Sequence, residues 1–387
     1  MSARPTVMHV VLNLMAGGTE RLVVELARRT RDAVQPVVCC LEGRGPLAAE
    51  LDALDIPVLE LNRTAGFHPS LGRRLGRAAA DCGAALLHCH QYSPFVYGVI
   101  AARLHRGLGV VFTEHGRATD APVTFKRRVA NAVVGRAPAS IFAVSGALRD
   151  HLIDEGFPAS RVAVIHNGIE LGPRVSALEQ PAVRRELGLP AGALVFGTVA
   201  RLDPVKDLAS LVDAFARVRS TAPASHLLIV GDGPEQAALA AQVQRAGLGH
   251  AVTFAGFRAD ARLLLPAIDV YVNSSVYEGI PLTVLEAMAA SLPVVATAVG
   301  GTSEVVAADT GLLVGARDAE GMAAAMRTLA ASIERRTGMG ARGRARVEAL
   351  FSIERMVSRY LTAYDETLVD RPLMRSPACV VSAGPSR

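Results

Sequence analysis

Aromatic residues are scarce in this chain. They make up 4% of the 387 residues, and tryptophan is absent. Because aromatic side chains supply the large flat contact surfaces of many binding sites, we do not expect an extended stacking platform for a long polysaccharide. Half of the residues are hydrophobic and a fifth are charged. This balance is typical of a folded globular protein and excludes a disordered chain.

Cysteines are few, and their spacing matches neither disulfide pairs nor metal ligands. Five are present, at positions 39, 40, 82, 89 and 379, without a C-x-x-C spacing. An odd number so arranged favours neither a disulfide framework nor a zinc site. The alternative is the cluster His88, Cys89 and His90. Alternate residues of a strand share a face, so only the two histidines would lie together, and we expect no metal site.

Long apolar segments are also missing. No run of about 18 uncharged apolar residues occurs that would suit a transmembrane helix. The N-terminal stretch, MSARPTVMHVVLNL, lacks the apolar core and the cleavage site of a signal peptide. These two absences predict a cytoplasmic protein.

The net charge of +5 arises entirely in residues 1–175. Basic residues here fall on amphipathic segments and include Arg73, Arg74, Arg77 and the run from Lys126 to Arg128. Such an excess is typical of a solvated charged face, which is the favoured interpretation. The alternative is an anionic acceptor or peripheral contact with the inner face of a cell membrane. We expect no nucleic-acid partner.

Strand and helix patterns alternate along the chain in two blocks. The length suggests two domains, and the pattern restarts at Leu194 after a connection, residues 170–192, that contains three prolines. Alternation of this kind predicts an α/β fold with parallel sheets covered on both faces. A last helix follows Ser352, and the tail over residues 371–387 is expected to be disordered.

Most predicted strands of the second block end at glycine or at a polar residue. Because the carboxyl ends of parallel strands share one edge of a sheet, where ligands bind, these residues should gather there. They are Arg201, Lys206, Gly231, Gly256, Phe257 and Glu278. Two cations at such an edge would suit a diphosphate. Isolated, Arg201 and Lys206 would be ordinary surface residues.

Two features of the first block belong to the same kind of edge. Gly17 and Gly18 follow the apolar run Val7 to Leu14 and precede an amphipathic helix, so the backbone there would let a phosphate approach closely. A tight turn for helix packing is the alternative. His115 ends a buried strand and precedes glycine, a position that favours function over a purely structural role.

The stretch YEGIPLTVLEAMAASLPVVAT, residues 277–297, carries the most specific pattern. It predicts a loop, a helix from Leu282 to Ala290 and a buried strand. The start of such a helix presents unpaired N–H groups to a phosphate or a polyhydroxylated ligand. Glu278 lies before that start, and Glu286, about two turns in, would accept hydrogen bonds from vicinal hydroxyls.

The E-x7-E pair of Glu278 and Glu286, within EGxPLTxLEAMA and followed by PVVAT and GGTSE, resembles the retaining family 4 glycosyltransferases. The resemblance extends from about Val7 to Leu368. It implies the GT-B fold, with two Rossmann-like doubly wound parallel-sheet domains facing a central cleft. The implied domains are an acceptor-side domain, residues 1–172 with a crossover helix at 352–370, and a nucleotide-sugar-binding domain, residues 173–351.

The resemblance also implies a role for each matching residue. Arg201 and Lys206 would bind the donor diphosphate, approached by Gly17 and Gly18, and Glu286 would bind the ribose. Glu278 and the backbone of Gly279, Ile280, Pro281 and Leu282 would bind the transferred sugar, near His115. Gly256 and Phe257 would border the nucleobase, with Gly231 to Pro234 beside it, whereas Ser145 and Asn167 have weaker claims.

The implied chemistry is metal-independent and retaining. Cations and helix starts would stabilise charge on the leaving diphosphate, and the chain contains no D-x-D motif. The leaving phosphate oxygen would deprotonate the acceptor on the same face, so no cofactor and no protein nucleophile are expected. Ser291 departs from the family, which commonly has glycine in the turn before PVV.

These features predict a transferase that moves a sugar from a nucleotide sugar to a hydroxyl of a lipid-linked or saccharide acceptor, in the synthesis of cell-surface polysaccharide or glycolipid. One alternative is the same chemistry on a small sugar, a sugar phosphate or a natural product. Another is a catalytically silent subunit that only binds nucleotide sugars. An epimerase of the same fold is less favoured, because the motifs follow the transferase pattern.

Overall fold

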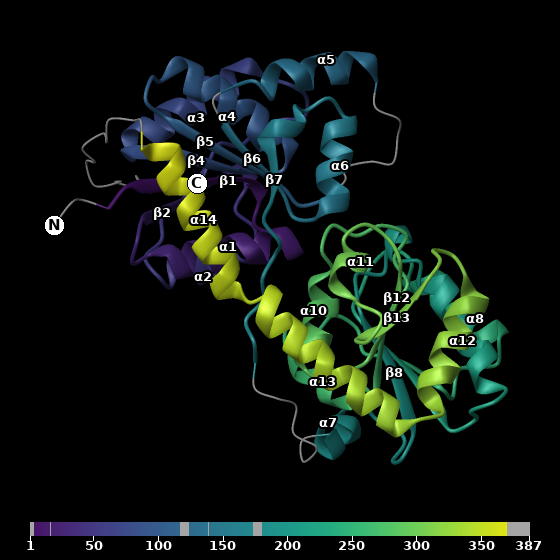
Figure 1. Ribbon diagram of the computed structural model, residues 1–387. Coiled ribbons are helices and arrows are strands. Elements are labelled where there is room, and N and C mark those ends of the chain that lie inside the picture. The colour runs from purple at the N-terminus through teal and green to yellow at the C-terminus, as the bar shows by residue number, and fades with distance from the viewer. Residues whose placement is uncertain (1–3, 16, 117–123, 138, 173–179, 370–387) are drawn as a thin grey trace. The chain divides into compact units, whose positions relative to one another are not determined.

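The computed structural model describes residues 4–15, 17–116, 124–137, 139–172 and 180–369. The tail expected to be disordered, residues 371–387, lies outside the described residues. The chain separates into two compact units, the first formed by residues 1–167 and 354–387 and the second by residues 168–353. Each unit contains its own parallel sheet (Figure 1).

The first unit is built on a seven-stranded sheet. Its strands are β1 (Thr6–Asn13), β2 (Gln35–Gly43), β3 (Val58–Glu60), β4 (Ala84–His90), β5 (Gly109–Glu114), β6 (Ala139–Ala143) and β7 (Val162–Val164). They lie in the order β3-β2-β1-β4-β5-β6-β7, and every neighbouring pair is parallel. The order reverses between β1 and β4, which is where ligands bind in open sheets of this kind.

Helices cover both faces of this sheet (Figure 1). They are α1 (Gly18–Thr30), α2 (Ala48–Asp52), α3 (Pro69–Asp81), α4 (Tyr92–Leu104), α5 (Phe125–Val134), α6 (Gly146–Asp154), the short η1 (Ala159–Arg161) and, from the far end of the chain, α14 (Ile353–Leu368). The α14 helix is attached by buried hydroxyls. Its Tyr364 hydroxyl lies 2.7 Å from His88 Nδ1, and its Tyr360 hydroxyl lies 3.2 Å from Thr113 Oγ1.

The second unit contains a six-stranded parallel sheet. Its strands are β8 (Leu194–Val199), β9 (Ser225–Val230), β10 (Val252–Phe254), β11 (Val270–Asn273), β12 (Val294–Thr297) and β13 (Gly311–Val314). They lie in the order β10-β9-β8-β11-β12-β13, with the reversal between β8 and β11. Phe196 of β8 and Phe215 pack in a fully buried core. Each such side chain contributes about 1.5 to 3 kcal/mol through burial.

The remaining elements of the second unit connect and cover these strands. They are α7 (Gln180–Glu186), η2 (Pro204–Lys206), α8 (Leu208–Arg219), α9 (Gln236–Arg245), η3 (Ala261–Ala267), α10 (Leu282–Ala289), α11 (Thr302–Val305), α12 (Ala319–Ala330) and α13 (Ile333–Leu350). None of the described helices combines the length and apolar character needed to span a bilayer.

The prediction of two α/β domains with parallel sheets is confirmed. Differences concern the extent of single elements. The sequence predicts a strand from Ala84 to His88, but β4 continues to His90, because backbone pairing with β5 extends to His90 and Thr113. Several helices were not predicted, among them α9, α12 and α13. The α13 helix has a strongly polar sequence and only a narrow apolar stripe, which weakens the signal of helical periodicity.

Two glycines allow loops at the carboxyl edge of the second sheet to touch. A Cβ atom on Gly231 would lie 1.8 Å from the Ala200 carbonyl oxygen, and one on Gly300 would lie 1.8 Å from the Glu278 carbonyl oxygen. Both glycines also have a positive φ, +139° and +48°. A side chain at either position would therefore push the two loops apart.

We predict that Gly300→Ala destabilises the second unit more than Gly247→Ala. Gly247 also has a positive φ, +69°, but a Cβ atom there meets nothing within 4 Å. Its substitution should cost roughly 1 to 2 kcal/mol from backbone strain alone. Gly300→Ala adds the clash with the Glu278 carbonyl oxygen. Its loss in the free energy of unfolding, measured in urea, should therefore be clearly larger. Equal losses in the two variants would contradict the tight approach of the loops.

Candidate functional site

A buried ion pair lies at the carboxyl edge of the second sheet, where the strand order reverses. Lys206 Nζ, in the loop after β8, lies 2.6 Å from Glu278 Oε1, in the loop after β11. The side chains are only 23% and 11% exposed. Because the two residues follow neighbouring strands, parallel pairing brings them together across 72 positions of sequence.

The Glu278 carboxylate is held by three donors that all reach the same oxygen. Oε1 accepts from Lys206 Nζ at 2.6 Å, from the Ser275 hydroxyl at 2.6 Å and from Asn273 Nδ2 at 3.3 Å. No described residue donates a hydrogen bond to Oε2. The carboxylate is therefore oriented by the protein through one oxygen and retains a second oxygen that can accept from the hydroxyls of a ligand.

The loop that carries Glu278 is fastened to both neighbouring strand ends. The Ser274 hydroxyl donates to the Lys206 carbonyl oxygen at 2.7 Å, and Val276 N donates to the Val205 carbonyl oxygen at 2.8 Å. On the other side, the Thr297 hydroxyl donates to the Ser275 carbonyl oxygen. Such bonds hold the carboxylate in place before a ligand arrives, which lowers the cost of ordering on binding.

The α10 helix begins directly after this loop. Pro281 is its N-cap, and no side chain caps the N-terminus. The first N–H groups of a helix have no partner within the helix, and with the positive end of the helix dipole they form a seat for an anion. Glu286 lies one turn into α10, not two as expected. Its Oε1 lies 3.6 Å from Arg262 Nε, a partner that the sequence did not suggest.

Arg201 lies at the same edge but is turned outward. Its guanidinium pairs with Asp203 at 2.6 Å, and its side chain is 74% exposed. Unlike Lys206, it is free to move toward a ligand at little cost, because an exposed ion pair is worth at most about 1 kcal/mol.

A second pair of loops meets beyond β9 and β10. Gly231 N donates to the Gly256 carbonyl oxygen at 2.8 Å. Phe257, the next residue, is 66% exposed. A large aromatic ring held out at a loop can stack against a planar group.

The first unit presents a cavity of about 410 Å³ at the carboxyl ends of β4 and β5. His115 forms part of its wall, together with Gln91, Tyr92, Glu114, Arg127 and Glu155. This volume is within the range of small-ligand sites, roughly 300 to 1,000 Å³. Gln91 has φ +74° and ψ 165°. Residues other than glycine rarely adopt this conformation. Strain of this kind clusters at functional sites.

Charge in this cavity is unevenly distributed. Burial raises the pKa of Glu114 to about 8, so this carboxyl is protonated at neutral pH. Arg127 Nη2 lies 3.3 Å from Glu155 Oε2. The Arg127 guanidinium also lies over the Tyr92 ring, with its Cζ atom 4.4 Å from the ring centroid. A cation held by a carboxylate and an aromatic face in this way keeps a fixed position.

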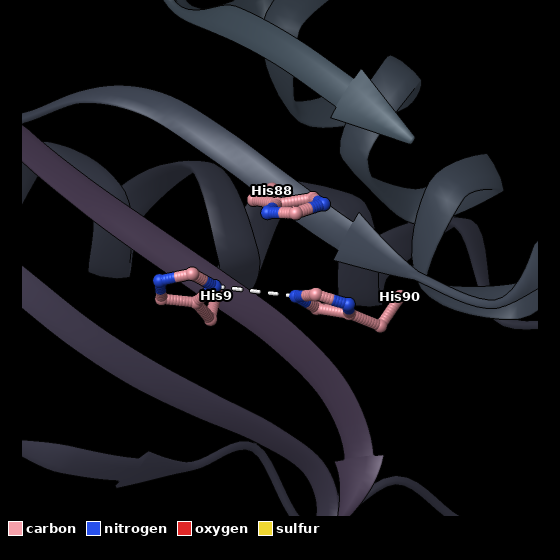
Figure 2. Close-up of side chains that lie close together, drawn as sticks. All are labelled: His9, His88 and His90. Atoms are coloured by element: carbon pink, nitrogen blue, oxygen red, sulfur yellow. Dashed lines mark hydrogen bonds between the residues drawn. The ribbon is translucent and has the colours of Figure 1, made fainter. Parts of the chain in front are cut away.

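His115 contacts His90, one of three buried histidines that Figure 2 shows. His9 of β1 lies beside His88 and His90 of β4, and their ligand nitrogens all lie within 4.8 Å of one another. The spacing of His88 and His90 did predict a shared face, but nothing in the sequence connected His9 with them. Histidine nitrogens are common zinc ligands, so this is the group of described residues that would be considered for a metal.

Burial lowers the pKa of each of these rings. The pKa of His9 falls to about 3 and that of His115 to about 4, and those of His88 and His90 lie well below the usual value. Neighbouring histidines lower the pKa values of His88 and His90 further. All four rings are therefore neutral at physiological pH.

The predicted residues thus fall into separate groups. In the second unit the structure joins Lys206 to Glu278 and Gly231 to Gly256, and it pairs Glu286 and Arg201 with other residues. Gly17 and Gly18 lie at the start of α1, in the first unit. The cavity that His115 lines is also in the first unit. Sequence reasoning missed Asn273 and Ser275, although polar residues directly after a buried strand could have indicated them.

Two family descriptions match the chain. Residues 16–172 match the family described as Glycosyltransferase Family 4, and residues 193–332 match the family described as Glycosyl transferases group 1. These segments contain Lys206, Glu278 and His115, whereas His9 precedes the first of them.

Two relatives differ in how much of the chain they match. The D-inositol 3-phosphate glycosyltransferase of Kineococcus radiotolerans is 31% identical over 410 residues, an alignment that covers 93% of each chain. The lipopolysaccharide core biosynthesis glycosyltransferase LpsE of Rhizobium meliloti is 34% identical over 201 residues, covering 52% of this chain and 56% of LpsE. The second match therefore spans about half the length of the relative.

The fold is shared with solved structures. The crystal structure of HepE from Anabaena in complex with UDP-glucose superposes with a TM-score of 0.82 at 25% sequence identity, covering 93% of this chain and 99% of HepE.

The buried histidines predict that the stability of the first unit depends on pH. As the pH falls below 6.5, the unfolded chain takes up a proton on each histidine, whereas folded His9 resists protonation down to about pH 3. The contribution of His9 to stability is therefore present above pH 6.5 and is lost as the pH falls toward 3. Between pH 7.5 and pH 5.5 this loss should be about 1.4 kcal/mol for one histidine.

Urea unfolding of the wild type and of His9→Phe at these two pH values measures the effect. The variant should lose less stability than the wild type by that amount, since Glu114 and the other histidines remain in both proteins. His68→Gln removes an exposed histidine and is the control. Its free energy of unfolding should change between the two pH values by as much as that of the wild type. Parallel pH profiles for wild type and His9→Phe would contradict the assignment of a neutral buried ring.

Proposed function

The chain belongs to family 4 of the glycosyltransferases, and from this membership we propose that it moves a sugar from a nucleotide-sugar donor to a hydroxyl acceptor. The observation that carries the proposal is the Lys206–Glu278 pair beside the uncapped start of α10, at the edge where the second sheet reverses its strand order. A cation, a free carboxylate oxygen and a helix start together suit a sugar diphosphate.

In the donor site proposed for the second unit, the charge and hydrogen-bonding capacity of each group determine which part of the donor it binds. Lys206 and the exposed Arg201 bind the phosphates, and Glu278 Oε2 with the N–H groups of Gly279, Ile280 and Leu282 binds hydroxyls of the transferred sugar. Glu286, partly exposed on α10, accepts from the ribose hydroxyls. The UDP-glucose complex of HepE supports a donor of this kind.

The nucleobase is placed beyond β9 and β10. The exposed Phe257 ring and the open side of Gly256, where a Cβ atom would meet nothing within 4 Å, leave room for a planar base. Gly231, whose close contact with Ala200 excludes a side chain, forms the wall beside it. Aromatic stacking would contribute to nucleotide affinity without selecting one base strongly.

We propose a retaining transfer that requires no metal. Breaking the bond between the anomeric carbon and the phosphate oxygen leaves negative charge on the diphosphate, which Lys206, Arg201 and the α10 N–H groups are placed to stabilise. The leaving phosphate oxygen then takes the proton of the acceptor hydroxyl on the same face of the sugar. Glu278 orients the sugar in this scheme, with Oε1 held by three donors and Oε2 accepting from a sugar hydroxyl, and the scheme requires no protein nucleophile.

Two acceptor classes are supported by different relatives. LpsE acts in lipopolysaccharide core biosynthesis, which supports a lipid-linked or cell-surface glycan acceptor, our first candidate. The relative from Kineococcus is named for D-inositol 3-phosphate, and the cavity of about 410 Å³ in the first unit has room for a small polyol of this size. We place the acceptor in the cavity of the first unit that His115 lines, and we propose the Gly17–Gly18 turn at the start of α1 as a contact for a phosphate.

Peripheral membrane contact is proposed for α5. Phe125, Val129 and Val133 recur every four residues and are 80%, 48% and 53% exposed, so they form an apolar stripe on one side of the helix. Lys126 and Arg128 beside them are exposed as well. An exposed apolar stripe with flanking cations is typical of helices that lie in the interface of an anionic membrane. Arg74, by contrast, is bonded to the Leu61 carbonyl oxygen.

The donor assignment predicts that Lys206→Met and Glu286→Gln lose nucleotide-sugar turnover. A thermal-shift screen with UDP-glucose and other nucleotide sugars first identifies the donor that stabilises the wild type. Release of the nucleoside diphosphate from that donor is then measured with saccharide and polyol acceptors. Lys206→Met should lower the rate by roughly 100-fold or more, because it removes a preorganised cation from the leaving group.

Arg217→Met is the matched control, since it breaks an exposed ion pair with Glu320 on other helices of the same unit. It should keep the wild-type rate. Full activity of both Lys206→Met and Glu286→Gln would refute the assignment. The acceptor that supports turnover decides between the two acceptor classes.

The membrane proposal predicts that the double variant Phe125→Ser/Val129→Ser loses affinity for vesicles of phosphatidylserine and phosphatidylcholine at low salt. Removing two apolar anchors should weaken binding roughly tenfold or more. Ile333→Ser removes a similarly exposed apolar side chain, 62% exposed, from the second unit and should bind as the wild type does. Equal sedimentation of all three proteins with the vesicles would exclude α5 as the contact.

A further inference from the structure

Three imidazole rings of the first unit form a hydrogen-bonded row. His9 Nδ1 lies 3.2 Å from His90 Nε2, and His90 Nδ1 lies 3.0 Å from His115 Nε2. The ring centroids are 5.5 Å and 5.3 Å apart, with interplanar angles of 23° and 27°. At these centroid distances the facing nitrogens point at each other, which is the geometry of two good hydrogen bonds. Figure 2 shows the first of them.

The two ends of the row are unsatisfied. His9 Nε2 and His115 Nδ1 are buried and have no hydrogen-bond partner among the described residues. A neutral imidazole carries one N–H and one lone pair. With both internal bonds made, the protons of the row can therefore take only two arrangements, and the choice of tautomer at one end determines the tautomer at the other.

His88 packs against the row without belonging to it. Its centroid is 4.0 Å from that of His90, but both of its nitrogens are engaged by hydroxyls, Nδ1 by Tyr364 at 2.7 Å and Nε2 by Thr113 at 2.9 Å. A metal ion bound by His9, His88 and His90 would have to break these bonds and turn His9 Nδ1 and His90 Nε2 away from each other. The geometry therefore favours a hydrogen-bonded row over a metal site.

We propose that His9 and His90 are positioning residues that fix the tautomer of His115, so that His115 Nδ1 carries the N–H. In this arrangement His9 donates to His90 and His90 donates to His115. The role rests on the proposed function, in which a sugar substrate binds in the cavity that His115 lines. His115 then acts on that substrate as a hydrogen-bond donor and is not available as a base.

The direction of the hydrogen bonds follows from the free-energy cost of an unpaired N–H group at either end of the row. An unpaired buried N–H group is rarer in proteins than an unpaired acceptor. The opposite arrangement would place that N–H on His9 Nε2, in a residue that is fully buried. The proposed arrangement places it on His115, a partly buried residue in the wall of the 410 Å³ cavity, so this is the end of the row that a ligand in the cavity can approach.

Nitrogen-15 NMR of the histidine side chains tests the row in the full-length protein without any substrate, because pyrrole-type and pyridine-type nitrogens have distinct shifts. The His115 signals are assigned by their loss in His115→Gln. The wild type should show a pyrrole-type Nδ1 and a pyridine-type Nε2 at His115. A wild-type His115 with its proton on Nε2 overturns the proposal, whatever the variants do.

Three variants separate positioning from packing. His9→Phe removes the first donor and should shift His115 toward the Nε2–H tautomer, whereas His9→Asn keeps an amide N–H near the place of Nδ1 and should restore the wild-type signals. His88→Gln disturbs the same buried cluster outside the row and should leave the His115 tautomer unchanged. Identical His115 signals in His9→Phe and wild type would also overturn the proposal.

Turnover gives a second readout, with the donor identified by the thermal-shift screen. His9→Phe should lower kcat/KM by roughly three- to tenfold, the worth of one hydrogen bond, and His9→Asn should recover most of it. If zinc raises the Tm of the wild type but not of His9→Phe, the histidines hold a metal and the row is refuted. If the NMR spectrum is as expected but the protein turns over no nucleotide sugar, the result contradicts the proposed function and leaves the tautomer proposal standing.

Discussion

Parallel pairing of neighbouring strands is the constraint on which the chemistry of this protein depends. In a parallel sheet every strand has its carboxyl end at the same edge, so residues far apart in sequence meet there. In each unit the strand order reverses once, between β1 and β4 and between β8 and β11. The Lys206–Glu278 pair lies at the second reversal. The His90 end of β4 and the cavity beside it adjoin the first.

The two units use burial in opposite ways. At the edge of the second unit a lysine and a carboxylate are only partly buried and neutralise each other. In the first unit His9, His88 and His90 are buried and neutral, because desolvation disfavours the charged imidazole. A charged group suits the binding of a diphosphate. A neutral ring, with one donor and one acceptor, suits the orientation of a single hydrogen bond.

Much of the fold could be predicted from periodicity. Apolar runs followed by glycine or polar residues indicated the strands and their ends, and the parallel alternation indicated that Lys206 and Glu278 would share an edge. Their direct contact confirms that they do. The partners of Arg201 and Glu286 were not predictable in this way. Asp203 is close to Arg201 in sequence, but Arg262 is on η3, and its approach to Glu286 depends on how that segment packs.

The sequence by itself determined the two α/β domains, the family and the edge residues, because these depend on local patterns and on a motif within about 20 residues. Only the tertiary structure decided which side chains touch. His9, His90 and His115 come from three segments, and strand register together with the end of β5 brings their nitrogens to 3.2 Å and 3.0 Å. Register is set by pairing across the whole sheet and not by neighbours in sequence, so no local pattern could have shown the row.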